Sequence, residues 1–205
     1  LVATSGRKAT RRLTPRPWDA SRDGLGRGEG ACTLILERLE HALQRGAPIL
    51  AESVGYGTNS DGQHVTQPSA GTMAEAIQLA LDDAGLASEQ IDYVNAHGTA
   101  TDHGDIAESQ ATAQIFGRRI PISSLKSYVG HMLGACGAFE AWASIEMMRG
   151  GWFAPTLNLV EPDPRCADLD YITGDGRDMS AEYVMSNNFA FGGINTSLIF
   201  RRWNP

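Results

Sequence analysis

The sequence predicts a layered α/β fold for this chain of 205 residues. Two observations carry the prediction. Short apolar runs of strand length recur between segments that show the i, i+3, i+4, i+7 spacing of one helical face. Glycines stand where most of those helices should stop. Alternation of this kind is typical of helices packed between or over sheets, and no repeat or linker interrupts it.

Composition places the chain among ordinary globular proteins, with 42% hydrophobic and 20% charged residues and a net charge of -7. This charge argues against nucleic-acid binding, which needs a clustered basic surface. Basic residues gather near the N-terminus, where a solvated arm and a docking site for an acidic partner both remain open. They are Arg7, Lys8, Arg11, Arg12 and Arg16. No apolar run approaches 18 residues, so we expect no membrane span.

The three cysteines, Cys32, Cys136 and Cys166, are widely spaced and odd in number. We therefore expect reduced thiols in a cytoplasmic protein, without a disulfide framework or a metal site. None stands in the electropositive, accessible setting that a nucleophilic thiol needs. The chain opens on Leu1 and not on Met, and we expect it to be a piece of a longer protein.

The first part of the chain begins with residues 1–30, an irregular segment rich in arginine and glycine. The apolar run 31–36 predicts a buried strand, and the next residues, 37–45, predict a helix that a glycine ends. A further strand is expected at 49–56, before a polar loop at 57–68. We expect residues 31–205 to form one domain.

The rest of the chain alternates helix and strand. Apolar residues on one face predict a helix at 73–84. Residues 132–148 are apolar nearly all round, which predicts a central buried helix. The remaining expected elements are strands at 91–95, 120–123, 184–186 and 194–200 and a helix at 104–116.

Two histidines stand where regular structure meets a loop. His97 follows the expected strand 91–95, and open α/β sheets bind ligands at the carboxyl ends of their strands. Thr99 and Thr101 offer hydroxyl groups on the same turn. A buried structural histidine and threonines that serve as turn or cap residues fit this spacing equally well.

Lys126 and His131 stand in a loop that leads into the apolar helix. A lysine in so apolar a region needs a carboxylate partner, and Glu140 on that helix is the natural candidate. His131 near a helix N-terminus should stay neutral, because the positive end of the helix dipole disfavours imidazolium. A neutral imidazole can donate a hydrogen bond to developing negative charge. A purely structural ion pair is the alternative.

Four motifs in order resemble the β-ketoacyl-acyl carrier protein synthases, most closely those of the synthase II type. They are Arg16-Pro-Trp-Asp with Arg22-Asp-Gly, Asn95-Ala-His-Gly-Thr-Ala-Thr, Lys126-Ser-Tyr-Val-Gly-His, and Asn187-Asn-Phe-Ala-Phe-Gly-Gly-Ile-Asn. The resemblance implies a thiolase-like fold, a mixed sheet with helices in layers, as the C-terminal half of a five-layer α/β/α/β/α architecture. The nucleophilic cysteine of that family lies in the N-terminal half, which is absent from this chain.

The resemblance implies a decarboxylative Claisen condensation that extends an acyl chain with malonyl-acyl carrier protein, in fatty-acid or polyketide synthesis. His97 and His131 would hold the malonyl thioester carbonyl, and Lys126 with Glu140 would set the electrostatics. No cofactor is implied beyond the phosphopantetheine of acyl carrier protein, or coenzyme A, that carries the substrates. The implied partners are acyl carrier protein and the N-terminal half or a cysteine-bearing subunit, in a homo- or heterodimer.

The resemblance also assigns substrate contacts, with threonines on the phosphopantetheine arm and Phe191 as a gate between the acyl and malonyl pockets. The residues concerned are Thr66, Thr99, Thr101, Phe189, Phe191, Gly192 and Gly193. Core packing before a hairpin is the alternative for the aromatic residues. A monovalent-cation site is implied at Asn95, Glu140, Ser186 and Asn187. A non-catalytic partner, similar to a chain-length factor, is the second hypothesis for the chain as a whole.

Overall fold

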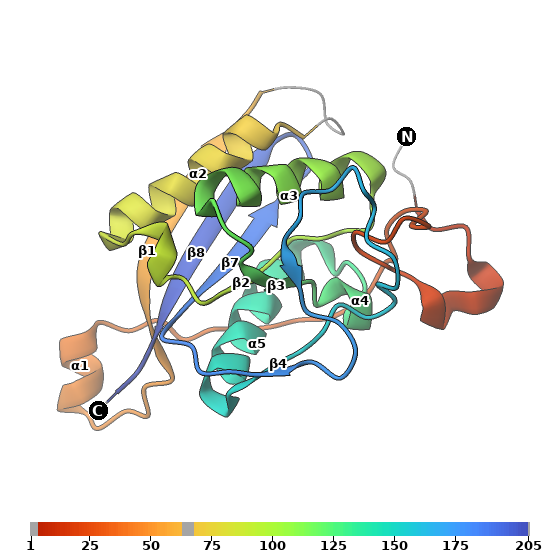
Figure 1. Cartoon of the computed structure of the whole chain (residues 1–205). Coiled ribbons are helices and arrows are strands. Elements are labelled where there is room, and N and C mark those ends of the chain that lie inside the picture. Colours follow the sequence, from red (N-terminus) through yellow and green to blue (C-terminus); the bar gives the residue numbers. More distant parts are fainter. Residues whose placement is uncertain (1–3, 63–67, 205) are drawn as a thin grey trace.

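The computed structural model describes residues 4–62 and 68–204. Six strands form a mixed sheet in the order β1-β8-β7-β2-β3-β5, and a separate two-stranded ribbon pairs β4 with β6 (Figure 1). Strands β1, β8 and β7 pair antiparallel, whereas β7, β2, β3 and β5 run parallel. The strands are β1 Ala51–Ser60, β2 Tyr93–Asn95, β3 Pro121–Ser123, β4 Trp152–Phe153, β5 Asp170–Tyr171, β6 Arg177–Asp178, β7 Tyr183–Phe189 and β8 Ile194–Arg202.

Helices cover both faces of the sheet, as the layered prediction requires. Helices α2 and α3 lie over one face and α5 lies beneath the other (Figure 1). The helices are α1 Leu39–Gln44, α2 Ala70–Ala84, α3 Asp102–Phe116, α4 Lys126–Val129 and α5 Cys136–Gly150, with short 3-10 helices at Lys8–Leu13, Ser88–Gln90 and Leu133–Ala135. No helix in the described ranges is long and apolar enough to cross a membrane.

Helix α2 shows how the predicted pattern is realised. The Ser69 side chain accepts a hydrogen bond from the Thr72 amide at the N-terminus, and Gly85 ends the helix in the left-handed conformation. Its apolar face is buried against the sheet, with Ile77 fully inaccessible. Glycine at position 57 of β1 permits this close packing, because a Cβ there would overlap the backbone of α2.

The irregular N-terminal segment is part of the same core. Trp18 is completely buried and lies in the hydrophobic cluster under α2 and α3. Two of the basic residues here form ion pairs within the chain, Arg7 with Asp23 at 3.6 Å and Arg16 with Asp19 at 3.1 Å.

Three expectations about regular structure are wrong. Residues 31–36 form no strand, and Ile35 and Leu36 are 82% and 81% exposed. An apolar run can form a strand only where a neighbouring strand offers it hydrogen bonds, and no strand among the described residues does so here. The expected loop 57–68 begins late, because pairing with the long β8 extends β1 to Ser60.

The helix expected at 132–148 begins at Cys136, after a 3-10 turn at Leu133–Ala135. It is not buried all round, since Trp142 is 43% exposed. Composition could not show which of its apolar faces the sheet covers. The short helix α4 was not expected.

Candidate active site

The two histidines meet at the carboxyl ends of the parallel strands. His97 follows β2, and His131 follows α4 after a single glycine. Their ring centroids lie 5.3 Å apart, with the ring planes almost perpendicular. Phe189 at the end of β7 packs edge-on against His97, at 6.2 Å between centroids. The sequence predicted both residues and placed His97 at this edge of the sheet, whereas the position of His131 there is shown only by the structure.

Lys126 and Glu140 form the buried ion pair that the sequence predicted. Lys126 Nζ lies 2.6 Å from Glu140 Oε1, and the two side chains are 1% and 0% exposed. Asn188 Nδ2 donates a further hydrogen bond of 3.1 Å to Glu140 Oε2. Burial raises the pKa of Glu140, and the Lys126 ammonium opposes that shift. A fixed positive charge thus stands beside the histidines.

His131 is held through its backbone and its ring. Its amide donates to the Gly26 carbonyl at 2.7 Å, and its carbonyl accepts from the Gly28 amide at 3.1 Å. The Leu133 amide donates to the ring Nδ1 at 3.0 Å, so in the neutral ring Nδ1 is the acceptor and Nε2 carries the proton. Cys136 Sγ also lies 3.2 Å from Nδ1.

Both imidazoles are neutral at physiological pH. Burial, reinforced by the charge of Lys126, lowers the pKa of His131 from 6.5 to about 4. The same two causes, with His131 as a third, hold the pKa of His97 well below its usual value. Neutrality was predicted for His131 from the helix dipole. Its cause is instead desolvation, because the ring lies before a 3-10 turn and α5 begins only at Cys136.

Carboxylates of α3 clamp the loop that carries His97. Glu108 accepts hydrogen bonds of 2.7 Å from the amides of both His97 and Gly98. Thr99 and Thr101 lie beyond this clamp, and their hydroxyl oxygens are 2.9 Å apart. The threonine pair and the histidine are thus presented together by one short loop.

The two phenylalanines at the end of β7 differ in burial. Phe189 is 6% exposed and belongs to the core, whereas Phe191 is 48% exposed. Gly192 and Gly193 follow with positive φ and turn the chain into β8. The packing alternative therefore holds for Phe189 and not for Phe191. Thr66, the remaining expected substrate contact, lies outside the described residues.

Comparison with known proteins decides the family. The model of the beta-ketoacyl synthase C-terminal domain matches residues 50–160, more than half of the chain. The chain belongs to the β-ketoacyl synthase family. The match includes both histidines, Lys126 and Glu140.

The chain is similar to longer synthases. It is 44% identical over 192 residues to 3-oxoacyl-[acyl-carrier-protein] synthase 2 of Coxiella burnetii, covering 91% of this chain and 46% of that protein. It is 43% identical over 194 residues to the chloroplastic synthase I of Hordeum vulgare, covering 93% and 42%. The chain therefore spans about half the length of these curated relatives.

Solved structures confirm the thiolase-like ketosynthase fold. A β-ketoacyl synthase from Burkholderia phymatum matches with a TM-score of 0.98 and 69% identity, over 99% of this chain and 50% of that one. A type II PKS acyl-carrier protein in complex with its ketosynthase matches with a TM-score of 0.92 and 36% identity, over 99% and 51%.

The residues expected to bind a monovalent cation fit that role only in part. Parallel pairing sets Asn95 beside Ser186, and the Asn95 Nδ2 donates to the Ser186 hydroxyl at 3.3 Å. The side-chain oxygens of Asn95 and Asn187 are buried and find no hydrogen-bond partner within the described ranges. Amide and carboxylate oxygens are suitable ligands for a hard cation. The Asn187 Nδ2 is also unpaired, and a cation would not satisfy it.

Several residues that shape this site were not predicted from the sequence. Glu108 was not singled out, yet it is only 2% exposed and bonds the His97 amide. Asn188 was passed over for Asn187, although it is the residue that bonds Glu140. Cys136 was considered only as a possible nucleophile, and its contact of 3.2 Å with His131 Nδ1 was not foreseen. The i, i+3 spacing of Asp105 and Glu108, directly after a Gly/Thr loop, was the one signal that could have found the clamp.

Proposed function

We propose that this chain supplies the histidine and lysine part of a ketosynthase site that joins acyl and malonyl thioesters by decarboxylative Claisen condensation. The substrates would be carried on the phosphopantetheine of acyl carrier protein, or on coenzyme A. One observation carries the proposal: two neutral imidazoles lie 5.3 Å apart beside a buried ammonium–carboxylate pair. Such a site can stabilise negative charge without itself taking up a proton.

The proposed chemistry begins at the malonyl thioester. Its carboxylate carbon–carbon bond breaks, carbon dioxide leaves, and the electron pair passes into an enolate whose oxygen accepts hydrogen bonds from the imidazoles. His131, with its proton on Nε2, is one such donor. The enolate carbon then attacks an acyl thioester on a cysteine, a new carbon–carbon bond forms, and the cysteine leaves as thiolate. The charge of Lys126 favours the anionic intermediates.

The acyl-carrying cysteine would come from outside these 205 residues. Burial raises the pKa of the Cys136 thiol, and that of Cys166 to about 11, so neither is activated as a nucleophile. Cys32 lies in a segment without regular structure. We infer that the isolated chain is inactive and that an N-terminal half, or a cysteine-bearing subunit in a homo- or heterodimer, completes the site.

We further propose acyl carrier protein as the partner, because the related ketosynthase whose structure contains such a protein shares this fold. Thr99 and Thr101 would bind the phosphopantetheine arm, and the exposed Phe191 would act as the gate. A monovalent cation held by Asn95, Glu140, Ser186 and Asn187 remains a proposal of the same kind. The three free thiols suit a cytoplasmic setting.

The test uses the complete enzyme, that is, this chain with the polypeptide that supplies the nucleophile. It should form a β-ketoacyl product from acyl and malonyl thioesters, and intact mass should place the acyl group on a cysteine outside this chain. The isolated chain should remain unmodified. Acyl loading of Cys32, Cys136 or Cys166 would refute the reaction scheme. Absence of product with full acyl loading would favour the second hypothesis, a chain-length-factor-like partner.

A further inference from the structure

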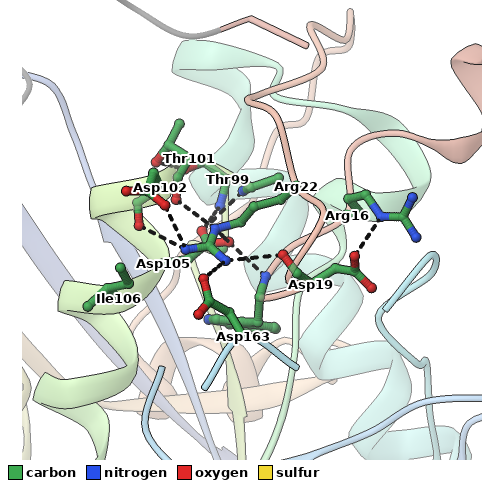
Figure 2. A network of polar contacts seen from close by, with 12 residues as sticks. Arg16, Asp19, Arg22, Thr99, Thr101, Asp102, Asp105, Ile106 and Asp163 are labelled. Carbon is green, nitrogen blue, oxygen red and sulfur yellow. Dashed lines mark hydrogen bonds and ion pairs between the residues drawn. The ribbon is translucent and has the colours of Figure 1, made fainter. Parts of the chain in front are cut away.

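Arg22 is a buried arginine that the proposed chemistry does not use. Its side chain is 2% exposed and lies at the centre of a network of carboxylates (Figure 2). The guanidinium is 2.6 Å from Asp163, 3.4 Å from Asp102 and 3.6 Å from Asp105. A buried cation is tolerated only when it is paired in this way. Two segments distant in sequence, the start of α3 and the loop of Asp163, therefore converge on the Arg22 side chain.

The network leads directly to the threonine loop. Asp105 Oδ1 accepts hydrogen bonds of 3.1 Å from the amides of both Thr99 and Ala100. Arg22 completes the grip by donating from Nε to the Thr101 carbonyl at 3.3 Å and from Nη2 to the Asp102 carbonyl at 3.1 Å. The loop is thus held from its amide side by Asp105 and from its carbonyl side by Arg22.

The loop needs external support because of its backbone conformation. Ala100 has φ of 63°, in the left-handed region. For a residue with a Cβ this conformation costs roughly 1–2 kcal/mol and persists only where the surroundings enforce it. The Ala100 carbonyl in turn accepts from the Gly24 amide at 3.1 Å, so the segment that carries Arg22 also holds the strained residue.

The two halves of this loop have separate anchors. Glu108 holds the amides of His97 and Gly98, whereas Asp105 and Arg22 hold the residues from Thr99 onward. A perturbation of Arg22 should therefore move the threonine hydroxyls and leave the imidazole in place.

We propose that Arg22 is a positioning residue for the substrate arm: through Asp105 and the Thr101 carbonyl it sets where Thr99 and Thr101 meet the phosphopantetheine. It acts on substrate binding and not on the chemical step. The identity of the bound arm rests on the proposed function. The role of Arg22 in positioning the loop does not depend on that function.

The test compares Arg22→Lys with Glu108→Gln in the complete enzyme. Lysine keeps the charge, but its single ammonium nitrogen cannot reach all three of the partners that Nε, Nη1 and Nη2 of the arginine bond separately. We expect Arg22→Lys to raise KM for the malonyl carrier substrate about tenfold, with kcat within about twofold, a loss equivalent to about 1.4 kcal/mol. Glu108→Gln should instead lower kcat and leave KM nearly unchanged. Arg149→Lys, at an exposed pair on α5, is the control.

Amide hydrogen exchange distinguishes a failure of the positioning role of Arg22 from a failure of the proposed function. In Arg22→Lys, the amides of Thr99 and Ala100 should exchange about tenfold faster, while those of His97 and Gly98 stay protected. Unchanged exchange at Thr99 and Ala100 overturns the positioning role, whatever the kinetics. Faster exchange with an unchanged KM overturns the assignment of the arm, and an unchanged KM in Thr99→Ala would trace that failure to the proposed function.

A double variant, Arg22→Gln with Asp163→Asn, guards against simple loss of folding. It removes one charge of each sign and leaves Arg165 bonded to Asp102. The same rise in KM, with cooperative thermal unfolding retained, supports the inference. A fall in kcat at normal KM contradicts it.

Discussion

Replacing Lys126 by methionine tests the electrostatic part of the site most severely. The side chains of Lys126 and Glu140 are 1% and 0% exposed and 2.6 Å apart. Without the lysine, Glu140 retains the hydrogen bond of 3.1 Å from the neutral side-chain amide of Asn188. Removing one partner of a buried pair costs about 3–5 kcal/mol. For a domain of this size each kcal/mol lowers Tm by about 2–4 °C, so Lys126→Met should lower Tm by at least ~6 °C at pH 7.5.

The double variant Lys126→Met with Glu140→Gln isolates the cause. It buries no unpaired charge, so most of the lost stability should return. The deficit of the single variant should also shrink as pH falls from 7.5 towards 5. Burial raises the folded-state pKa of Glu140 above its unfolded value, so the protonated form stabilises the fold at low pH and that contribution is lost as pH rises.

The assay is thermal unfolding of the complete enzyme, followed by calorimetry. Arg149→Met serves as the control, because the Arg149–Glu146 pair on the same helix is 46% and 39% exposed and should contribute less than about 1 kcal/mol. Equal Tm values for the single and double variants, or a deficit that does not change with pH, would refute the reasoning.

Three further predictions follow from the site. His131 has a folded-state pKa of about 4, below its unfolded value, so the free energy of unfolding should fall by about 1–2 kcal/mol as pH drops from 6.5 to 4. In His131→Asn, Tm should depend less on pH across that range. Cys136→Ala should slow decarboxylation about two- to fivefold, because it removes a polar partner of the His131 imidazole. Cys136→Ser and Cys166→Ala keep a polar partner there and should leave the rate unchanged. Phe191→Ala should change stability by less than about 0.5 kcal/mol yet impair condensation, because this ring is 48% exposed; Tm and product formation measure the two effects.

Much of the fold was readable from local patterns. The apolar face of α2, the glycine that ends it, and the run that becomes β2 are features of neighbouring residues, and each was placed correctly. Residues 31–36 failed because a strand is defined by its partner, which no local pattern reveals. The exposed Trp142 on α5 was missed for a related reason: composition reports how apolar a helix is, but not how much of it the sheet covers.

The site divides in the same way. Lys126 and Glu140 were paired because an uncompensated buried charge is prohibitive, and Glu140 on the following helix was the natural candidate. Arg22 and Asp163 could not be paired from sequence, since 141 positions separate them and each has several charged neighbours. The contact between Cys136 and His131 could not be predicted, because it depends on the orientation of the His131 ring, which only the three-dimensional structure provides.

Carbon dioxide release from the malonyl thioester is the most direct measurement, made on the complete enzyme with His131→Ala beside the unaltered protein. Acyl loading of the nucleophile is measured in the same samples by intact mass. Loss of a hydrogen-bond donor to the enolate should slow decarboxylation by about 10²–10³-fold and leave acyl loading within about twofold. Unimpaired carbon dioxide release, or an equal loss of both steps, would contradict the role assigned to the histidine pair.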